Sequence, residues 1–243
     1  MAISIHKPTV IQVIQPTAAT SHVEANVTIQ GTELKQVETM KYLGSIISQD
    51  ASLDAEIDYR VTSAWGKHHQ LAALWKNPQI KRNIKARIFD ACVSSRLLYG
   101  CATWAITPGQ LSKLNFAYIL MVCKALHIQR RFPGEDGSWS SISYREVLRA
   151  AGLEDLQVKI DTRTLKFAGH VARMGPDRNP NRLLFNNATP TGSHSYTHTV
   201  AAAATRADIA GSWQVTAQIR SYWSQKIASY ISRSNLGKHK RKR

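Results

Sequence analysis

The chain has 243 residues, 43% of them hydrophobic, and its 32 basic and 16 acidic side chains give a formal net charge of +16 and a pI near 10.0. This composition argues against a disordered or collagen-like chain, and no window approaches the ~18 consecutive apolar residues of a membrane span. The first residues lack the basic and apolar regions of a signal peptide, and three irregularly spaced cysteines predict no disulfide framework. We expect an intracellular protein with no membrane partner.

Positive charge is concentrated in the second half of the chain. Residues 121–243 hold 20 basic and 8 acidic side chains, and residues 238–243 form a terminal basic run. A basic excess of this size attracts polyanions, of which nucleic acid is the commonest in cells. The charge therefore predicts nucleic acid as the partner, with a merely solvated basic surface as the alternative. The terminal run is also typical of a nuclear import signal, which favours a nuclear location.

The first 50 residues have strand character. Short runs rich in β-branched residues or alternating in polarity predict strands over residues 9–15, 26–30, 33–37 and 42–47. The second and third runs flank Gly31-Thr32, which predicts a hairpin with a type II′ turn. In the last run, Gly44 is expected to mark a bend within a single strand.

From Ser52 onward the hydrophobic period becomes helical. Helices are expected over residues 52–77, 79–99, 107–128, 143–151, 156–174 and 208–233. Thr107-Pro108 is an N-cap followed by proline at the first helical position, and Ser143 with Glu146 forms a capping box. The first three helices are expected to form one bundle. Residues 186–205 contain no charged side chain and are predicted to be a linker.

The inward stripe of the second helix is predicted from its spacing, with Ile80, Ile84, Ile88, Ala91 and Val93 facing the core. The same helix and its approach carry a basic cluster in which Asp90 is the one acid: Lys76, Lys81, Arg82, Lys85, Arg87 and Arg96. A second cluster, Arg163, Lys166, His170 and Arg173, repeats at spacings of three to four. Both clusters suit contacts with successive phosphates, and an ordinary solvated helix face is the alternative.

Seven strings in sequence order resemble the region that follows the catalytic core in reverse transcriptases of non-LTR (LINE-type) retrotransposons. They occupy residues 37–48, 53–60, 64–66, 85–93, 97–104, 146–148 and 169–174. The resemblance covers roughly residues 5–185. In that family Lys41, Tyr42, Leu43 and Gly44 would belong to the primer grip, a hairpin that holds the 3′ end of the growing strand. Lys7 would lie near the triphosphate of the incoming nucleotide, although Pro8 and Met40 depart from the family pattern.

The predicted strands and helices indicate a mostly helical α+β fold, which the resemblance divides into four parts. Residues 1–50 would be a palm remnant with the primer-grip hairpin, and residues 51–130 a thumb-like helical bundle. Residues 131–185 would be a basic helical extension, followed by a linker, an amphipathic helix and a basic tail in residues 186–243. The chain would bind RNA or DNA primer-template through the grip and the thumb.

The catalytic residues of an RNA-directed DNA polymerase are missing from this sequence. Such enzymes hold two Mg²⁺ ions on aspartates that include a Tyr/Phe-x-Asp-Asp hairpin, and this chain has no x-Asp-Asp string. We expect that it begins after the catalytic centre, has no catalytic or metal-binding residues of its own, needs no cofactor and does not polymerise alone. The alternatives are a degenerate transposon relic without selected activity and a basic helical regulator that binds duplex DNA.

Other chemistry receives little support from the sequence. Cys92, Cys101, Cys123 and His127 could supply zinc ligands, but no Cys-x2-Cys pair is present and buried thiols are favoured. Trp65, Trp75 and Trp104 lie at helical spacing, which favours core packing over base stacking. No nucleophile motif occurs and no small-molecule substrate is evident.

Overall fold

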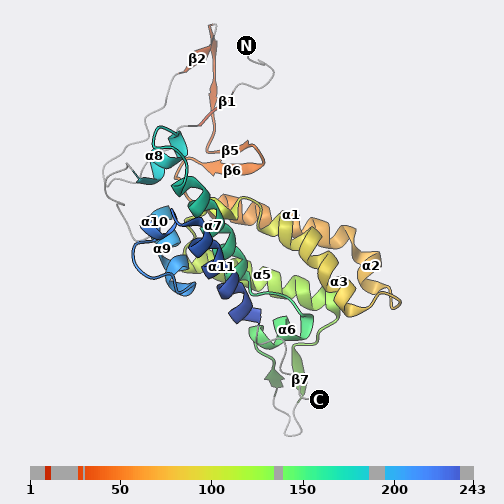
Figure 1. Cartoon of the computed structure of the whole chain (residues 1–243). Helices are drawn as coiled ribbons and strands as arrows, with labels where there is room; N and C mark the ends of the chain where they lie inside the picture. The colour runs from red at the N-terminus through yellow and green to blue at the C-terminus, as the bar shows by residue number, and fades with distance from the viewer. Residues whose placement is uncertain (1–8, 12–26, 30, 134–138, 186–194, 236–243) are drawn as a thin grey trace. The chain divides into compact units, whose positions relative to one another are not determined.

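The computed structural model describes residues 9–11, 27–29, 31–133, 139–185 and 195–235, and in these ranges the chain is a mostly helical α+β protein, as predicted (Figure 1). Two compact units are formed, residues 1–59 and residues 60–243. Within the described residues, no helix is long and apolar enough to cross a membrane.

The strands are short and pair two by two. They are β1 (Thr9–Val10), β2 (Thr28–Ile29), β3 (Thr32–Glu33), β4 (Lys35–Gln36), β5 (Thr39–Tyr42), β6 (Ser45–Ser48), β7 (Arg131–Pro133) and β8 (Trp139–Ser141). The pair β1–β4 is parallel, and β2–β3, β5–β6 and β7–β8 are antiparallel.

The helices account for most of the ordered backbone. They are α1 (Asp54–Gln70), α2 (Ala72–Lys76), α3 (Arg82–Phe89), α4 (Ser95–Leu97), α5 (Pro108–Leu126), α6 (Tyr144–Ala151), α7 (Leu156–Ala172), α8 (Asn179–Phe185), α9 (Tyr196–Arg206), α10 (Trp213–Thr216) and α11 (Arg220–Asn235). A π-helical turn, Asp90–Ser94, joins α3 to α4, and a 3₁₀ turn follows at Cys101–Thr103.

In the first unit, the strands form two antiparallel hairpins, one predicted from the strand pattern and one not. The pair Ile29–Thr32 closes a two-residue loop whose second residue is Gly31, at φ +78°, so the turn lies one residue earlier than predicted. The single strand expected over residues 42–47 is wrong. Tyr42 pairs with Ser45, and Leu43-Gly44 forms a tight turn between β5 and β6.

A buried carboxylate fixes the β5–β6 hairpin to the start of α1. The side chain of Glu56 is 1% exposed, and its Oε2 accepts a hydrogen bond of 2.6 Å from the backbone N–H of Ile46 on β6. Lys41 on β5 donates to the hydroxyl of Tyr59 at 2.6 Å and lies 4.8 Å from the centre of its ring. A buried carboxylate is tolerated only when it is hydrogen-bonded. The bond from Ile46 to Glu56 therefore holds the hairpin against the first turn of α1.

In the second unit, the helical bundle follows local sequence signals closely. Thr107 caps α5 through a complete capping box with Gln110, and Ser143 caps α6 in the same way with Glu146. Gly152, at φ +68°, ends α6 in the left-handed conformation that glycine adopts without steric cost. The predicted helix over residues 52–77 is divided at Leu71 into α1 and α2.

The inward face predicted for α3 is wrong by about one residue. Ile84 is 39% exposed and Ala91 is exposed, whereas Lys85 and Phe89 are buried. Val93 is buried, as predicted. The long lysine side chain makes this face possible, because its methylene groups pack while its ammonium reaches a carbonyl. The π turn after α3 then rotates the face, so Leu97 and Leu98 are also buried.

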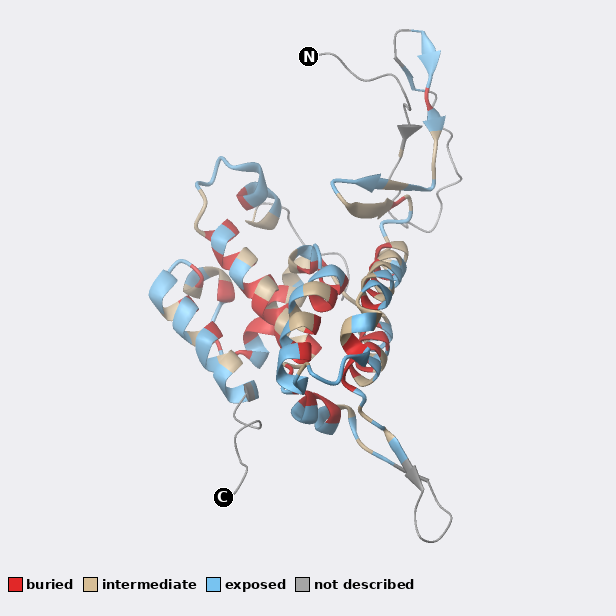
Figure 2. Cartoon of the chain, turned by 90° about the vertical axis from the view of Figure 1, so that its right-hand side faces the viewer, coloured by how far each residue is buried: buried red, intermediate tan, exposed pale blue. Residues whose placement is uncertain are grey.

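Helix α7 is the centre of the second unit, and eleven of its residues are buried. It contacts α5, α8, α9, α11 and the 3₁₀ turn, and buried residues gather on these facing surfaces (Figure 2). The buried carboxylate of Asp161 accepts hydrogen bonds of 2.7–2.8 Å from Gln157, from two nitrogens of Arg206 on α9 and from the hydroxyl of Tyr230 on α11. Three helices are thereby joined at one residue.

The predicted linker is wrong in its second half. Residues 196–206 form α9, whose Val200, Ala203 and Ala204 belong to the same buried cluster as Leu165 of α7. Local signals missed this helix because its apolar face consists mainly of alanine. The predicted last helix is too long at its start, since Val215 and Ile219 are exposed and the helix begins at Arg220.

Helices α7 and α11 cross at a glycine. The indole N–H of Trp223 donates to the carbonyl of Leu165 at 2.9 Å, and a Cβ placed on Gly169 would lie 2.7 Å from Cδ1 of Trp223 and overlap its ring. Gly66 on α1, by contrast, has open space around the position of its Cβ. The two helical glycines therefore differ in what a side chain would meet.

We expect Gly169→Ala to lower the free energy of unfolding by about 1–3 kcal/mol, because the added methyl overpacks the crossing. Gly66→Ala should instead raise it by about 0.5–1 kcal/mol through helix propensity. Urea midpoints at constant m-value measure both changes. Equal effects of the two substitutions would contradict the close α7–α11 crossing.

His68 is a buried titratable side chain on α1. Neither of its ring nitrogens has a hydrogen-bond partner in the described residues, and its ring centroid lies 5.2 Å from Trp65, 5.9 Å from His69 and 5.7 Å from Trp75. Burial lowers the pKa of His68 from its ordinary value of 6.5, and the positive charges of His69 and Lys124 lower it further.

A lowered pKa in the folded state means that the unfolded chain binds the proton first. We therefore expect the free energy of unfolding to fall as the pH drops below 6.5, and His68→Leu should reduce this loss. Chemical denaturation at pH 7.5 and pH 5.0 measures it, with His198→Gln at an exposed histidine of α9 as the control. If His68→Leu and the parent lost the same stability, the titration of His68 in this core would be disproved.

Candidate nucleic-acid interface

The hairpin tip of the first unit exposes two large side chains. Tyr42 is 56% exposed and Leu43 is 79% exposed. Leu43 has φ +47° and Gly44 φ +88°, as a type I′ turn requires at both central positions. A leucine in the left-handed region is uncommon and costs conformational energy. The residues expected in a primer grip thus form an exposed, strained turn, with Lys41 held against Tyr59. Lys7, expected near the triphosphate, lies outside the described residues.

Five of the six cations predicted around the second helix are exposed. Lys76, Lys81, Arg82 and Arg87 lie between the end of α2 and the end of α3, and Arg96 lies beyond the π turn, on α4. None of their side chains has a hydrogen bond or ion pair within the described part of the chain. Lys81 is the N-cap of α3 and Arg82 its first residue, and the first turn contains no acidic side chain. The N-terminus of a helix carries partial positive charge, which the cations Lys81 and Arg82 add to. An anion bound there would compensate both charges.

Lys85 does not belong to this exposed set, and the expectation that its ammonium is available to phosphate is wrong. It is 7% exposed and donates a hydrogen bond of 2.5 Å to the carbonyl of Trp75, at the end of α2. Nε2 of His127 lies 2.9 Å from the same oxygen. The spacing placed Lys85 among the cations, but the fold uses it to tie α2 to α3.

The second predicted cluster is divided in the same way. Arg163 donates to the carbonyl of Leu98 at 2.7 Å, and Arg173 donates to the carbonyl of Ala217 at 2.7 Å. Both guanidinium groups therefore hold neighbouring segments against α7. Desolvation, with nearby Arg220, also lowers the pKa of Arg173. Only Lys166 and His170 of this cluster are exposed.

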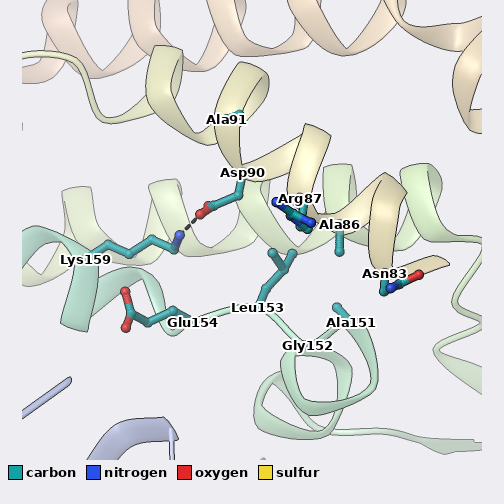
Figure 3. Close-up of a pocket in the computed structure, with 10 residues that line it drawn as sticks. All are labelled: Asn83, Ala86, Arg87, Asp90, Ala91, Ala151, Gly152, Leu153, Glu154 and Lys159. Atoms are coloured by element: carbon teal, nitrogen blue, oxygen red, sulfur yellow. Dashed lines mark hydrogen bonds and ion pairs between the residues drawn. The ribbon is translucent and has the colours of Figure 1, made fainter. Parts of the chain in front are cut away.

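A groove of about 580 Å³ lies between α3 and the connection from α6 to α7 (Figure 3). It is lined by Asn83, Ala86, Arg87, Asp90, Ala91, Ala151, Gly152, Leu153, Glu154 and Lys159. Lys159 of α7 forms an ion pair with Asp90 across it. Of the groove residues, the sequence had marked only Arg87 as a binding residue. The other polar groups gave no signal, because residues 83–91 and 151–159 meet only in the folded chain.

Tyrosine hydroxyls hold the far wall of the groove in place. Tyr144 donates to Oδ1 of Asn115 at 3.1 Å and accepts from the backbone N–H of Leu156 at 3.3 Å. Tyr118 donates to the carbonyl of Glu154 at 3.5 Å. Burial raises the pKa of both tyrosines, with further contributions from the negative charges of Asp90 at Tyr118 and Asp155 at Tyr144. Both remain hydrogen-bond donors at neutral pH.

The proposed zinc ligands and stacking tryptophans are placed elsewhere. Cys101 is buried, while Cys92 and Cys123 are half-buried, not fully inward as predicted. In the described ranges, no three His, Cys, Asp or Glu residues come together as a metal-binding group. Trp75 and Trp104 are buried in the core, as predicted. Trp65 is half-buried beneath the ammonium of Lys124.

Comparison of the chain with protein-family models, with curated proteins and with solved structures finds no match. The functional argument therefore uses the residues and their geometry.

The different positions of Lys85 and Lys81 can be tested without a ligand. We expect a brief treatment of the native protein with an amine-acetylating reagent to modify Lys76 and Lys81 and to modify Lys85 several-fold more slowly, because Lys85 reacts only after local opening. Peptide mass spectrometry reads the three sites, and the urea-unfolded chain is the control in which all should react alike. Rapid native acetylation of Lys85 would refute its burial.

Proposed function

We propose that this chain is a nucleic-acid-binding protein related to the primer-grip and thumb region of non-LTR retrotransposon reverse transcriptases. Its function would be binding of a primer-template or similar duplex, not polymerisation, because the x-Asp-Asp string that holds the catalytic metals does not occur in its sequence. The terminal basic run would direct it to the nucleus.

One observation supports binding most directly: the four exposed and unpaired cations Lys76, Lys81, Arg82 and Arg87. On a helix face of mixed charge, basic side chains can pair with acidic ones at i, i+4. Here the nearby acid in sequence is Asp90, and it forms its ion pair with Lys159 of α7. Phosphates would release counterions from such a surface on binding. The exposed hairpin tip at Tyr42-Leu43 agrees separately with the resemblance to a primer grip.

The competing proposal of an inert relic makes no use of this arrangement. A relic would carry its charge by inheritance, with no selection to keep Lys81 and Arg82 together at the start of α3 without an acidic side chain in the first turn.

We expect the triple variant Lys76→Gln, Lys81→Gln, Arg82→Gln to flatten the dependence of log K on log salt by about 2–3 units on B-form DNA, since each lost phosphate contact removes ~0.9. Fluorescence anisotropy at several salt concentrations measures the slope, on a blunt duplex and on one with a recessed 3′ end. The matched control is Arg178→Gln, Arg182→Gln, Arg220→Gln, which removes the same charge from exposed positions elsewhere.

The control variant should retain nearly the parent slope. Equal slopes for the two triple variants would reduce the binding to overall charge and remove the support for a specific surface. Absence of binding at low salt would refute the proposed function and favour the inert relic.

A further inference from the structure

The groove beside α3 has no net charge, although it lies in a basic surface. Arg87 and Lys159 contribute two positive charges, and Asp90 and Glu154 two negative ones. Lys159 and Asp90 compensate each other in their ion pair. A phosphate would gain little from entering such a groove, because Glu154 would repel it. The groove therefore suits a neutral polar ligand, while the cations around it suit phosphates.

The lining combines an apolar surface with two unpaired charged groups. Ala86, Ala91, Ala151 and Leu153 supply the apolar part. Arg87 lies beside Leu153 on the α3 side of the groove, and Glu154 lies farther along the α6–α7 connection, near Lys159 (Figure 3). Neither side chain has a hydrogen bond or ion pair among the described residues. A flat ligand over Leu153 would meet hydrogen-bond donors at one edge and acceptors at the other.

The backbone at this place is also unusual. Asp90 and Ala91, which line the groove, belong to the π-helical turn that interrupts the second helix. Such turns are rare and occur often at functional sites. The cavity volume of about 580 Å³ lies within the range of small-ligand sites, about 300–1,000 Å³.

We propose that this groove binds one unpaired guanine base of the nucleic acid held by the surrounding cations. The inference rests on the proposed function. The carboxylate of Glu154 would accept hydrogen bonds from N1–H and the N2 amino group of the base, and the guanidinium of Arg87 would donate to O6 and N7. Leu153 and Ala86 would pack against the flat face of the base.

The pattern of donors and acceptors selects guanine among the bases. Its N1–H and N2 amino group are adjacent donors that match the two oxygens of a carboxylate, and its O6 and N7 are adjacent acceptors that match a guanidinium. Adenine and cytosine offer one amino group beside an acceptor that a carboxylate would repel. Thymine and uracil place a carbonyl on each side of their N–H. Guanine is therefore the base that can form two hydrogen bonds with the carboxylate and two with the guanidinium.

Fluorescence anisotropy with labelled 15-nucleotide thymidine oligomers tests the proposal. The central base is guanine, adenine, cytosine or thymine, so the phosphate contacts are identical. We expect the full chain to bind the guanine oligomer about fivefold or more tightly than the others, which corresponds to the lower end of one bidentate base contact. Glu154→Gln should abolish this preference, whereas Asp177→Asn, a matched change at an exposed carboxylate, should retain it.

A second measurement does not depend on any variant. Guanosine monophosphate should displace the guanine oligomer from the parent chain at lower concentration than adenosine monophosphate, which carries the same phosphate. Equal binding of all four oligomers, a preference for another base, or a preference that survives Glu154→Gln would overturn the guanine site and leave the proposed function intact. Failure of every oligomer and duplex to bind at low salt would overturn both.

Discussion

The buried carboxylate of Asp161 is the interaction on which the second unit depends. It is 1% exposed and receives hydrogen bonds from three side chains, two of them on helices that follow it by about forty and seventy residues. A charge in this position is tolerated only with a full set of partners. The contact with its carboxylate raises the pKa of Arg206, while burial, together with Asp161, raises that of Tyr230. Helices α9 and α11 must therefore return to α7 for the core to be stable.

The groove follows from the same constraint. Lys159 precedes Asp161 by less than one turn of α7, so fixing α7 also fixes the ammonium that pairs with Asp90. The α6–α7 connection is held by Tyr144 and Tyr118 against α5. Helix α5 also contacts α3. One wall of the groove is therefore a helix packed on α5, and the other is a short connection that buried tyrosines hold in place.

The net charge of +16 overstates the surface available to an anion. Lys85, Arg163, Arg173 and Arg206 each hold a carbonyl or a buried carboxylate, so their charges belong to the packing. The exposed cations at Lys76, Lys81, Arg82 and Arg87 form a smaller set. Their side chains have no acidic partner among the described residues, so they are available to an anion. A proposal of nucleic-acid binding from total charge alone would have included groups that cannot reach a phosphate.

Local chemistry in the sequence determined the helix boundaries that depend on adjacent residues. Thr107 with Pro108, and Ser143 with Glu146, were identified correctly because helix capping is decided within a few residues. The mostly helical α+β class also followed from hydrophobic period. The β5–β6 hairpin was missed by strand pattern, since Leu43 is not a usual residue for a turn with positive φ, although the family resemblance implied a hairpin there.

Only the tertiary structure decided which side chains are buried and which meet. Lys85 and Ile84 exchanged their expected environments because the carbonyl of Trp75 lies within reach of a lysine, and residue type does not reveal such a partner. Helix α9 is stabilised by burial of small apolar side chains against α7 and by Arg206 at Asp161, neither of which is encoded locally. The groove joins residues 83–91 and 151–159. Their charged side chains form one site only because long-range packing brings the two segments together.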